Sequence, residues 1–168
     1  MSDMKARLHT GELYFPGGDE IMKEQMAYQD LLCEYNQTKP SEVEKRAGLL
    51  KEMLGDCGEG VYIEAPFYAN FGGHHCHIGK YVYINYNLTC VDDTHIYIGD
   101  YTMLGPNVTI ATAGHPILPE LRQKGLQYTL PPRSHPASFL KAPLFFLLRT
   151  AWSDYTRKVN PDKPSVPS

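Results

Sequence analysis

Two stretches near the start of the chain have the hydrophobic spacing of amphipathic helices. In the first, from about residue 19 to residue 38, apolar side chains recur at i, i+3, i+4 and i+7, so they share one helical face. The residues on this face are Tyr28, Leu31, Leu32 and Tyr35. Proline disfavours helical backbone in the residue before it, so we expect this helix to end at Lys39-Pro40.

The second helix is predicted to begin at Ser41 and to end near Gly55. Ser41 and Glu44 have the spacing of a capping box, in which each side chain binds a free backbone amide of the other residue. The predicted apolar stripe of this helix is Val43, Ala47, Leu50 and Leu54. Both stripes need an apolar surface to cover, and we assign residues 1–57 to an N-terminal helical segment.

From about Val61 the spacing of the aliphatic residues changes to six. Each member of two series is followed four residues later by a smaller or branched side chain. The first series is Ile78, Ile84 and Cys90, with Val82, Leu88 and Thr94 as companions. The second is Ile98, Leu104 and Ile110, with Thr102, Val108 and Gly114. This period fits neither a helix nor simple strand alternation, and it indicates an internal repeat.

A coil with three short flat sides explains the six-residue period. Each side contributes one inward aliphatic residue, and stacked coils pair through parallel strands. Glycines such as Gly79, Gly99 and Gly105 suit the corners, where a Cβ is costly. We therefore predict a mainly β fold, a parallel β-helix over residues 58–131. The alternative is a β-sandwich of short strands, which has no reason to keep a six-residue register twice.

Residues 132–168 differ in composition from the rest of the chain. All 14 glycines precede residue 132, whereas six of the 13 prolines lie within this stretch. Its six basic and two acidic residues give a charge of +4, so residues 1–131 carry −7. The six-residue pattern stops here, and the apolar run at residues 144–148 is too short to span a bilayer. We expect a tail outside the β-helix that is disordered or loosely helical.

Charge and composition exclude several classes of protein. A net charge of −3 over 168 residues gives no basic surface for nucleic acid or for a membrane. The first 15 residues lack the apolar run of a secretory signal and no stretch reaches transmembrane length, so we expect a cytoplasmic protein. The four cysteines have no CxxC spacing and are predicted to be reduced and mostly buried. They are Cys33, Cys57, Cys76 and Cys90.

Several short motifs follow one another in an ordered combination. Those within the repeat are Asn85-Tyr86-Asn87-Leu88-Thr89, Val91-Asp92-Asp93, Ile98-Gly99-Asp100, Pro106-Asn107-Val108-Thr109 and Gly114-His115-Pro116. Those before it are Gly11-Glu12-Leu13-Tyr14, Tyr35-Asn36 and residues 40–46. Through these motifs residues 1–131 resemble the maltose and galactoside O-acetyltransferases, which are left-handed β-helices of hexapeptide repeats. The resemblance implies transfer of acetyl from acetyl-CoA to a hydroxyl of a sugar such as maltose, glucose or a galactoside. It also implies a homotrimer with active sites between subunits.

Such a transfer needs a base that takes the hydroxyl proton, and histidine suits this function because its pKa lies near neutrality. The resemblance assigns the function to His115, at the start of a polar loop over residues 115–127. Pro116 favours extended backbone in His115, and Gly114 leaves room for a ligand. The alternative is that His115 only caps a turn.

Three further residues are candidate contacts of the sugar. Asn85 and Asp93 resemble the family's acceptor-site residues, because an amide both donates and accepts and a carboxylate accepts from hydroxyls. Asn70 is a plausible third contact. For Asn85 the alternative is a left-handed corner residue, since asparagine tolerates that conformation.

The sequence departs from the family pattern in the acceptor region. Relatives often place an aspartate where Phe15 and Pro16 stand here, and Asp19 is displaced from that position. Gln127 lies where the galactoside enzymes have an apolar contact. We therefore expect a shifted range of acceptors, and the sequence does not name the physiological sugar.

The donor side departs further from the pattern. In the family, later coils supply most of the acetyl-CoA groove, and none of their motifs follows Pro131. We therefore assign no coenzyme-contacting residue. The alternative function is a family member without the acetyl-CoA site, a non-enzyme that binds sugar weakly or only self-associates.

The run His74-His75-Cys76-His77 contains metal-ligating residue types. Hexapeptide-repeat carbonic anhydrases bind zinc through histidines, with three protein ligands and an open position. Neighbouring side chains on a strand point to opposite faces, so at most alternate members could share one ion. Nothing else reproduces the pattern of that family, and we expect no metal.

Overall fold

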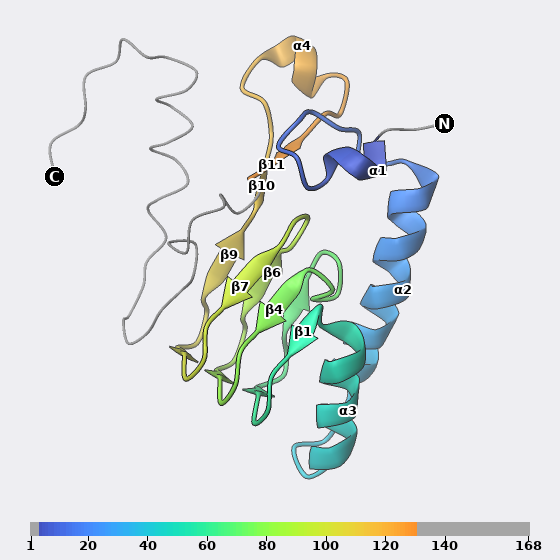
Figure 1. The fold of residues 1–168 in the computed structure, drawn as a ribbon. Helices are drawn as coiled ribbons and strands as arrows, with labels where there is room; N and C mark the ends of the chain where they lie inside the picture. The colour runs from blue at the N-terminus through green and yellow to red at the C-terminus, as the bar shows by residue number, and fades with distance from the viewer. Residues whose placement is uncertain (1–3, 131–168) are drawn as a thin grey trace, which may run out of the picture.

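The computed structural model describes residues 4–130. Within them the chain forms four α-helices and eleven short strands, arranged as a β-helix with two long helices against its first coil (Figure 1). The predicted tail of residues 132–168 lies outside the described part. No helix in residues 4–130 is both long and apolar enough to cross a membrane.

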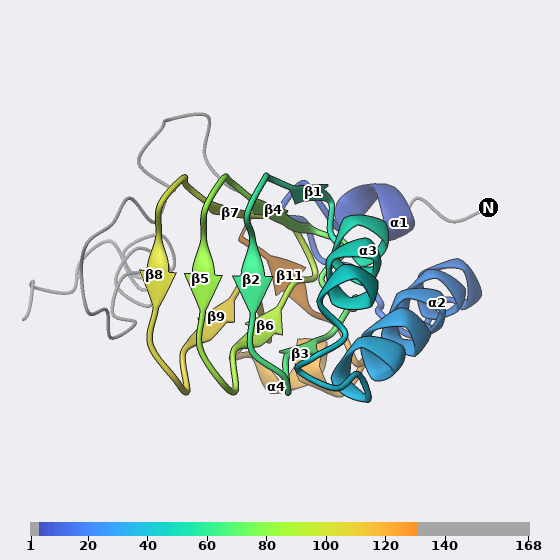
Figure 2. The same cartoon turned by 90° about the horizontal axis from the view of Figure 1, so that it is seen from below.

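Nine of these strands form three parallel sheets, one for each side of a triangular coil (Figure 2). The strands are β1 (Asp56–Cys57), β2 (Tyr62–Ile63), β3 (Tyr68–Ala69), β4 (Cys76–Ile78), β5 (Tyr83–Ile84), β6 (Thr89–Val91), β7 (Ile96–Ile98), β8 (Met103–Leu104) and β9 (Thr109–Ala111). The sheet orders are β1-β4-β7, β2-β5-β8 and β3-β6-β9, so each coil gives one strand to each sheet. Cys57 pairs with Ile78, 21 residues on, and Ile78 with Ile98, 20 residues on.

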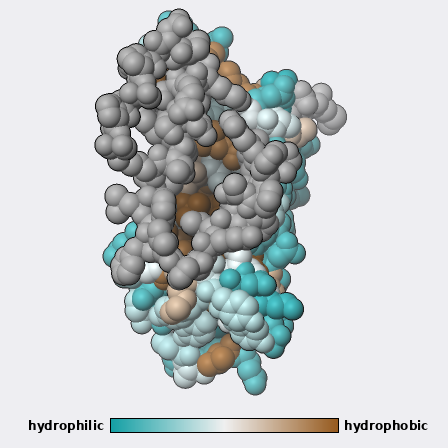
Figure 3. Space-filling model, turned by 60° about the vertical axis from the view of Figure 1, so that its left-hand side comes forward, coloured by the Kyte–Doolittle hydropathy of each residue, from teal (hydrophilic) through white to brown (hydrophobic). Residues whose placement is uncertain are grey.

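The six-residue pattern predicted from the sequence is confirmed by the register of the strands. Three columns of side chains run through the coils and form the core of the β-helix. They are Cys57–Ile78–Ile98, Ile63–Ile84–Leu104 and Ala69–Cys90–Ile110. The β-helix begins with β1 at Asp56, two residues before the predicted boundary. On the described surface in Figure 3, hydrophobic residues form small groups among hydrophilic ones.

The sharp corners of the coils are occupied by tyrosine and asparagine. Tyr81, Asn87, Tyr101 and Asn107 all have left-handed backbone, with φ between 55° and 61°. Corners of the same kind stack in neighbouring coils, because Tyr81 lies 5.4 Å from Tyr101 and Asn87 Nδ2 donates to Asn107 Oδ1 at 3.1 Å. Gly79 has another reason to lack a side chain, since a Cβ there would lie 2.3 Å from Oδ1 of Asp100 in the next coil.

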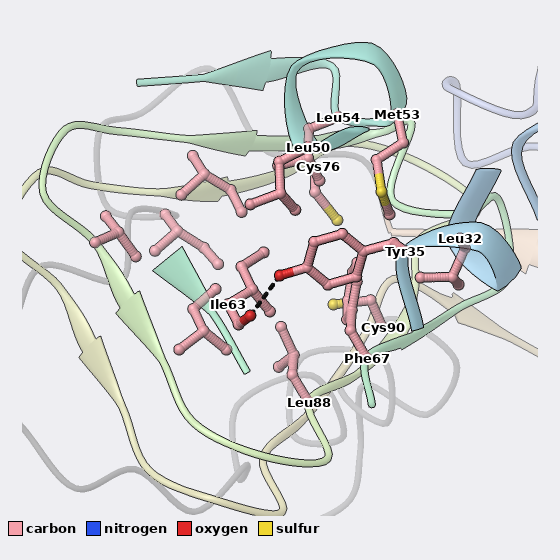
Figure 4. Close-up of a cluster of buried hydrophobic side chains, with 14 of the residues drawn as sticks. Leu32, Tyr35, Leu50, Met53, Leu54, Ile63, Phe67, Cys76, Leu88 and Cys90 are labelled. Atoms are coloured by element: carbon pink, nitrogen blue, oxygen red, sulfur yellow. Dashed lines mark hydrogen bonds between the residues drawn. The ribbon is translucent and has the colours of Figure 1, made fainter. Parts of the chain in front are cut away.

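The first predicted helix is confirmed as α2 (Asp19–Asn36), which follows the short helix α1 (Met4–Arg7). Leu32 and Tyr35 are buried, while Tyr28 and Leu31 on the same face are half-buried. Tyr35 reaches into the core among the apolar side chains of the first coil and the following helix (Figure 4).

The face predicted for the second helix, α3 (Val43–Met53), is wrong. Val43 is 58% exposed and Ala47 is exposed, whereas the buried side is Arg46, Leu49, Leu50 and Met53. The predicted capping box is also absent, because Glu42 is the N-cap and makes no side-chain cap bond. Glu42 instead accepts from the Lys39 backbone N–H at 2.6 Å, so it holds the turn between the two helices.

The buried face of α3 is shifted because Arg46 is needed beneath the first coil. There Ile63 and Phe67 have backbone groups with no strand below them, and such groups are costly when buried and unpaired. Arg46 Nη2 donates to the Ile63 carbonyl at 2.6 Å, and Tyr35 Oη donates to the same oxygen (Figure 4). Asn36 Nδ2 donates to the Phe67 carbonyl at 2.7 Å, and its Oδ1 accepts from the Phe67 N–H at 2.9 Å.

The prediction for the cysteines holds in part. All four are free thiols. Cys76 and Cys90 are buried in the core and Cys57 is half-buried, but Cys33 is exposed on α2. Burial raises the pKa of the Cys57 thiol.

After β9 the chain leaves the coil as an arm, which comprises residues 113–130. The arm contains β10 (Ala113–Gly114), α4 (Pro119–Arg122) and β11 (Tyr128–Thr129), and it lies beside α1 above the coils in Figure 1. β10 and β11 pair antiparallel. The predicted loop of residues 115–127 connects these two strands.

We predict that Asn36→Ala lowers the free energy of unfolding by about 2 kcal/mol, because it leaves an N–H and a carbonyl of Phe67 unpaired beneath the first coil. Urea unfolding followed by circular dichroism measures this change. Glu52→Gln, on the exposed side of α3, is the control and should leave the unfolding midpoint unchanged. Equal stability of the two variants would show that the side chain of Asn36 does not support the coil.

Candidate active site

Asp93 lies at the corner between β6 and β7, where it is 4% exposed and surrounded by donors. Tyr14 Oη and Gln127 Nε2 each donate to Oδ2 at 2.8 Å. Asn70 Nδ2 donates to Oδ1 at 2.9 Å. Gln127 Nε2 also donates to Tyr14 Oη, and we call these four residues the Asp93 network.

The Asp93 network leaves a defined acceptor position. A carboxylate has about four lone-pair sites, and the three donors occupy three of them, so Oδ1 can accept one more hydrogen bond. Burial, followed by the charge of Asp93, raises the pKa of Tyr14, which therefore stays a protonated donor. Asn70 is half-buried, and its Oδ1 accepts no hydrogen bond from residues 4–130.

Two members of the Asp93 network were not predicted as its partners. Asn70 and Asp93 were expected to share a site, and the structure brings them together. Gln127 was noted only as a departure from the family, and Tyr14 only as part of a motif. An antiparallel bridge joins these two residues through backbone bonds of 2.9 and 3.0 Å, so the arm holds the N-terminal segment.

His115 is exposed at the base of the arm, directly after β10. Its neighbour Pro116 is buried and anchors this turn. The room expected beside Gly114 is filled, because a Cβ there would meet the Tyr128 hydroxyl at 2.8 Å. Within residues 4–130 no side chain forms a hydrogen bond with the His115 imidazole, so nothing in this part of the chain fixes its tautomer.

His115 and Asp93 belong to the same corner of the β-helix. The residue before β10 is Thr112, whose N–H donates to the Val91 carbonyl at 2.9 Å. Its Oγ1 accepts from the Thr94 N–H at 3.1 Å, one residue from Asp93. The arm therefore starts beside the Asp93 network.

Asn85 lies at a different corner. It follows β5, between the sheets β2-β5-β8 and β3-β6-β9, whereas Asp93 lies between β3-β6-β9 and β1-β4-β7. The alternative that Asn85 holds a left-handed corner is wrong, because that conformation belongs to Asn87. Asn85 Oδ1 accepts from the Tyr86 N–H at 2.8 Å, which leaves its Nδ2 able to donate. One chain therefore does not bring Asn85 and Asp93 together.

The side chains of His74-His75-Cys76-His77 diverge. Cys76 points into the core, and His74 stacks on Tyr28 of α2 with ring centroids 3.7 Å apart. In the described residues, no three His, Cys, Asp or Glu side chains are placed so that they could hold one metal ion.

Comparison with known proteins identifies the family. A family model described as the maltose acetyltransferase hexapeptide capping motif matches residues 7–58. The galactoside O-acetyltransferase of Lactococcus lactis is 51% identical over 88 residues, which are 52% of this chain and 42% of that protein. The chain therefore spans less than half the length of this curated relative.

Two solved structures have the same fold. A galactoside acetyltransferase in complex with coenzyme A is 39% identical with a TM-score of 0.74, over 78% of this chain and 65% of that one. A maltose O-acetyltransferase from Clostridium difficile 630 is 32% identical with a TM-score of 0.74, over 76% and 68% of the two chains. The chain belongs to the maltose and galactoside O-acetyltransferase family of left-handed, hexapeptide-repeat β-helices.

Proposed function

We propose that the protein transfers an acetyl group from acetyl-CoA to a sugar hydroxyl. One observation carries the proposal: the exposed imidazole of His115 and the remaining acceptor position of Asp93 lie at the same corner of the β-helix. The 51% identical relative is a galactoside O-acetyltransferase, and the similar galactoside acetyltransferase structure contains coenzyme A. Maltose, glucose and galactosides are the candidate acceptors.

In this proposal each polar group has a separate function. His115 takes the proton of the sugar hydroxyl, whose oxygen then forms a bond with the thioester carbonyl carbon. The carbon–sulfur bond breaks, and the coenzyme A thiolate leaves and takes up a proton. Asp93 Oδ1 accepts from a second sugar hydroxyl, and the free amide oxygen of Asn70 accepts from a third. No residue within 4–130 is assigned to acetyl-CoA.

Asn85 enters the site only through a second copy of the chain. Because it lies at another corner, its Nδ2 reaches an acceptor bound at Asp93 when two copies meet corner to corner. The face beside Asn85 has the apolar character of a contact surface, since several large side chains there are 46–69% exposed. They are Tyr81, Tyr86, Tyr101 and Met103. We propose a homotrimer, in which each of three equal interfaces holds one site.

We predict that His115→Asn lowers the rate of sugar-dependent acetyl transfer by about 10²- to 10⁴-fold, because no base then takes the hydroxyl proton. Thiol release from acetyl-CoA, with and without maltose, glucose or a galactoside, measures this rate. Glu120→Gln in the same arm is the matched control and should keep the wild-type rate. Equal sugar-dependent rates in wild type and His115→Asn would reject the base. If wild-type protein neither releases thiol nor binds acetyl-CoA in calorimetry, the non-enzyme alternative is correct.

A mixing experiment tests the site between subunits. Asn85→Ala and His115→Asn should each be inactive alone, because every site lacks one residue. In mixed trimers about a quarter of the interfaces combine an intact His115 with an intact Asn85 from a neighbour, so co-expression should restore about a quarter of wild-type activity. Activity no greater than that of the two separate variants would place both residues in one subunit's site or in none.

The Asp93 network generates a prediction about stability. Tyr14→Phe removes a donor from the buried Asp93 carboxylate and should lower the free energy of unfolding by about 2 kcal/mol, since hydrogen bonds to buried charges are among the stronger ones. Chemical unfolding measures the change, and Tyr86→Phe, at an exposed tyrosine, is the control. If both variants are as stable as wild type, the hydroxyl of Tyr14 does not hold Asp93.

A further inference from the structure

Five of the seven histidines gather in one place, although they come from three separate parts of the chain. This histidine cluster comprises His9, His74, His75, His77 and His95. The His9 ring stacks on His95 with centroids 4.6 Å apart and meets the edge of His75 at 5.0 Å. His95 lies 5.6 Å from His75 and 5.0 Å from His77, and His74 lies 5.3 Å from His75. The acetyl transfer proposed above uses none of the five.

Hydrogen bonds hold the cluster in an uncharged state. His75 Nδ1 donates to the Asp92 carbonyl at 2.6 Å, because a carbonyl only accepts. His77 Nδ1 donates to the Asp56 carboxylate, so a neutral His77 accepts at Nε2 from His95 Nδ1 at 2.8 Å. Additional protons would place positive charges about 5 Å apart in a partly buried site, where their repulsion is poorly screened.

The cluster lies at the joint between the N-terminal segment, residues 4–18, and the β-helix. His9 comes from this segment, and a hydrogen bond of 2.9 Å joins its Nδ1 to Thr94 Oγ1. His75 comes from the β-helix, is 5% exposed, and packs against His9 and Phe71. Phe71 itself belongs to a small apolar cluster with Leu8 and Tyr14 of the segment. Water therefore reaches His75 only when the N-terminal segment moves away.

Few charges around the cluster would offset additional protons. The other titratable groups that face it are Lys5, Glu24, Tyr28, Asp56, Asp92 and Tyr97. Lys5 already pairs with Glu24 at 3.0 Å. Asp92 is fully buried, and its carboxylate accepts from the backbone N–H groups of Phe71 and Gly73 at 2.8 and 3.0 Å. Only Asp56, on the exposed side, bonds directly to an imidazole.

We propose that the histidine cluster is a proton-sensitive joint, which releases residues 4–18 from the β-helix when the solution is acidified. Tyr14 lies in the same segment, so its release removes a donor from Asp93 as well. The proposal stands whether or not the chain transfers acetyl groups.

The direction of the effect follows from the pKa values of the histidines. Burial lowers the pKa of His9, His74 and His95 from the ordinary 6.5, and lowers that of His75 to about 4. A depressed histidine pKa gives stability that is complete above pH 6.5 and is lost as the pH falls toward 4. For His75 alone, the ratio of closed to open joint should fall roughly 30-fold from pH 7.5 to pH 5.

Asp92 would act in the opposite direction if the same motion exposed it. Burial raises its pKa to about 6, so its protonation favours the folded state as the pH falls below 6. Its two donors, Phe71 and Gly73, both lie in the turn between β3 and β4. Release of the N-terminal segment leaves these bonds in place, so Asp92 does not cancel the effect of the histidines.

Amide hydrogen exchange of the full chain, followed by NMR in the presence of a chelator, tests the proposal. From pH 7.5 to pH 5, the backbone N–H groups of Tyr14 and Gln127, which bond to each other's carbonyls, should lose about 30-fold in protection relative to the intrinsic rates. The N–H groups of Gly73 and Tyr62, within the β-helix, should keep theirs. Loss at all four amides would mean global acid unfolding, and loss at none would mean a joint that ignores protons. Either result overturns the proposal.

A variant isolates the contribution of the cluster. His75→Phe keeps a ring of similar size that takes no proton, so it should remove most of the pH dependence at Tyr14. His115→Phe, outside the cluster, should retain the wild-type pH dependence. If His75→Phe does not fold, the imidazole resonances of wild type decide instead: those of the cluster should titrate together with the loss of protection, below pH 6.5. Titration of these rings without any loss of protection would overturn the proposal.

Discussion

A stack of parallel coils has a first coil, and the backbone groups below that coil need partners. In this protein they find them in two helices that present polar groups from an otherwise apolar face. Tyr35 and Arg46 both bond the carbonyl of Ile63, and the amide of Asn36 pairs with both backbone groups of Phe67, as a neighbouring strand would. The columns of the β-helix depend on this cover, because it lets the first coil form without a coil beneath it.

The repeat could be predicted from the sequence because its signal is local. Each flat side needs one inward residue, so a period of six appears directly in the chain, and the register of Ile78 and Ile98 follows from it. The face of α3 could not be predicted in this way. Apolar spacing treats Arg46 as a surface residue, whereas here the cation is 3% exposed and bonds a backbone oxygen. A polar residue buried for its hydrogen bonds leaves no mark in a hydrophobic pattern.

The candidate site shows the same division. Family motifs pointed to Asn70, Asp93 and His115, and the first two share a hydrogen bond. The contacts of Asp93 with Tyr14 and Gln127 span 79 and 34 residues, and no local spacing encodes them. The histidine cluster has the same limit. His74-His75-Cys76-His77 stood out in the sequence, but the packing of His9 and His95 around His75 depends on the fold.

The bridge between Tyr14 and Gln127 sets an order in which the molecule can be completed. A chain growing from the ribosome makes its two helices before the first coil, so each new coil finds its support already present. Tyr14 is synthesised early, yet its partner comes 113 residues later. Until the arm has emerged, the N-terminal segment lacks this anchor and Asp93 lacks two of its three donors. The coils can therefore assemble progressively during translation, whereas the corner that holds the candidate site is finished in one late step.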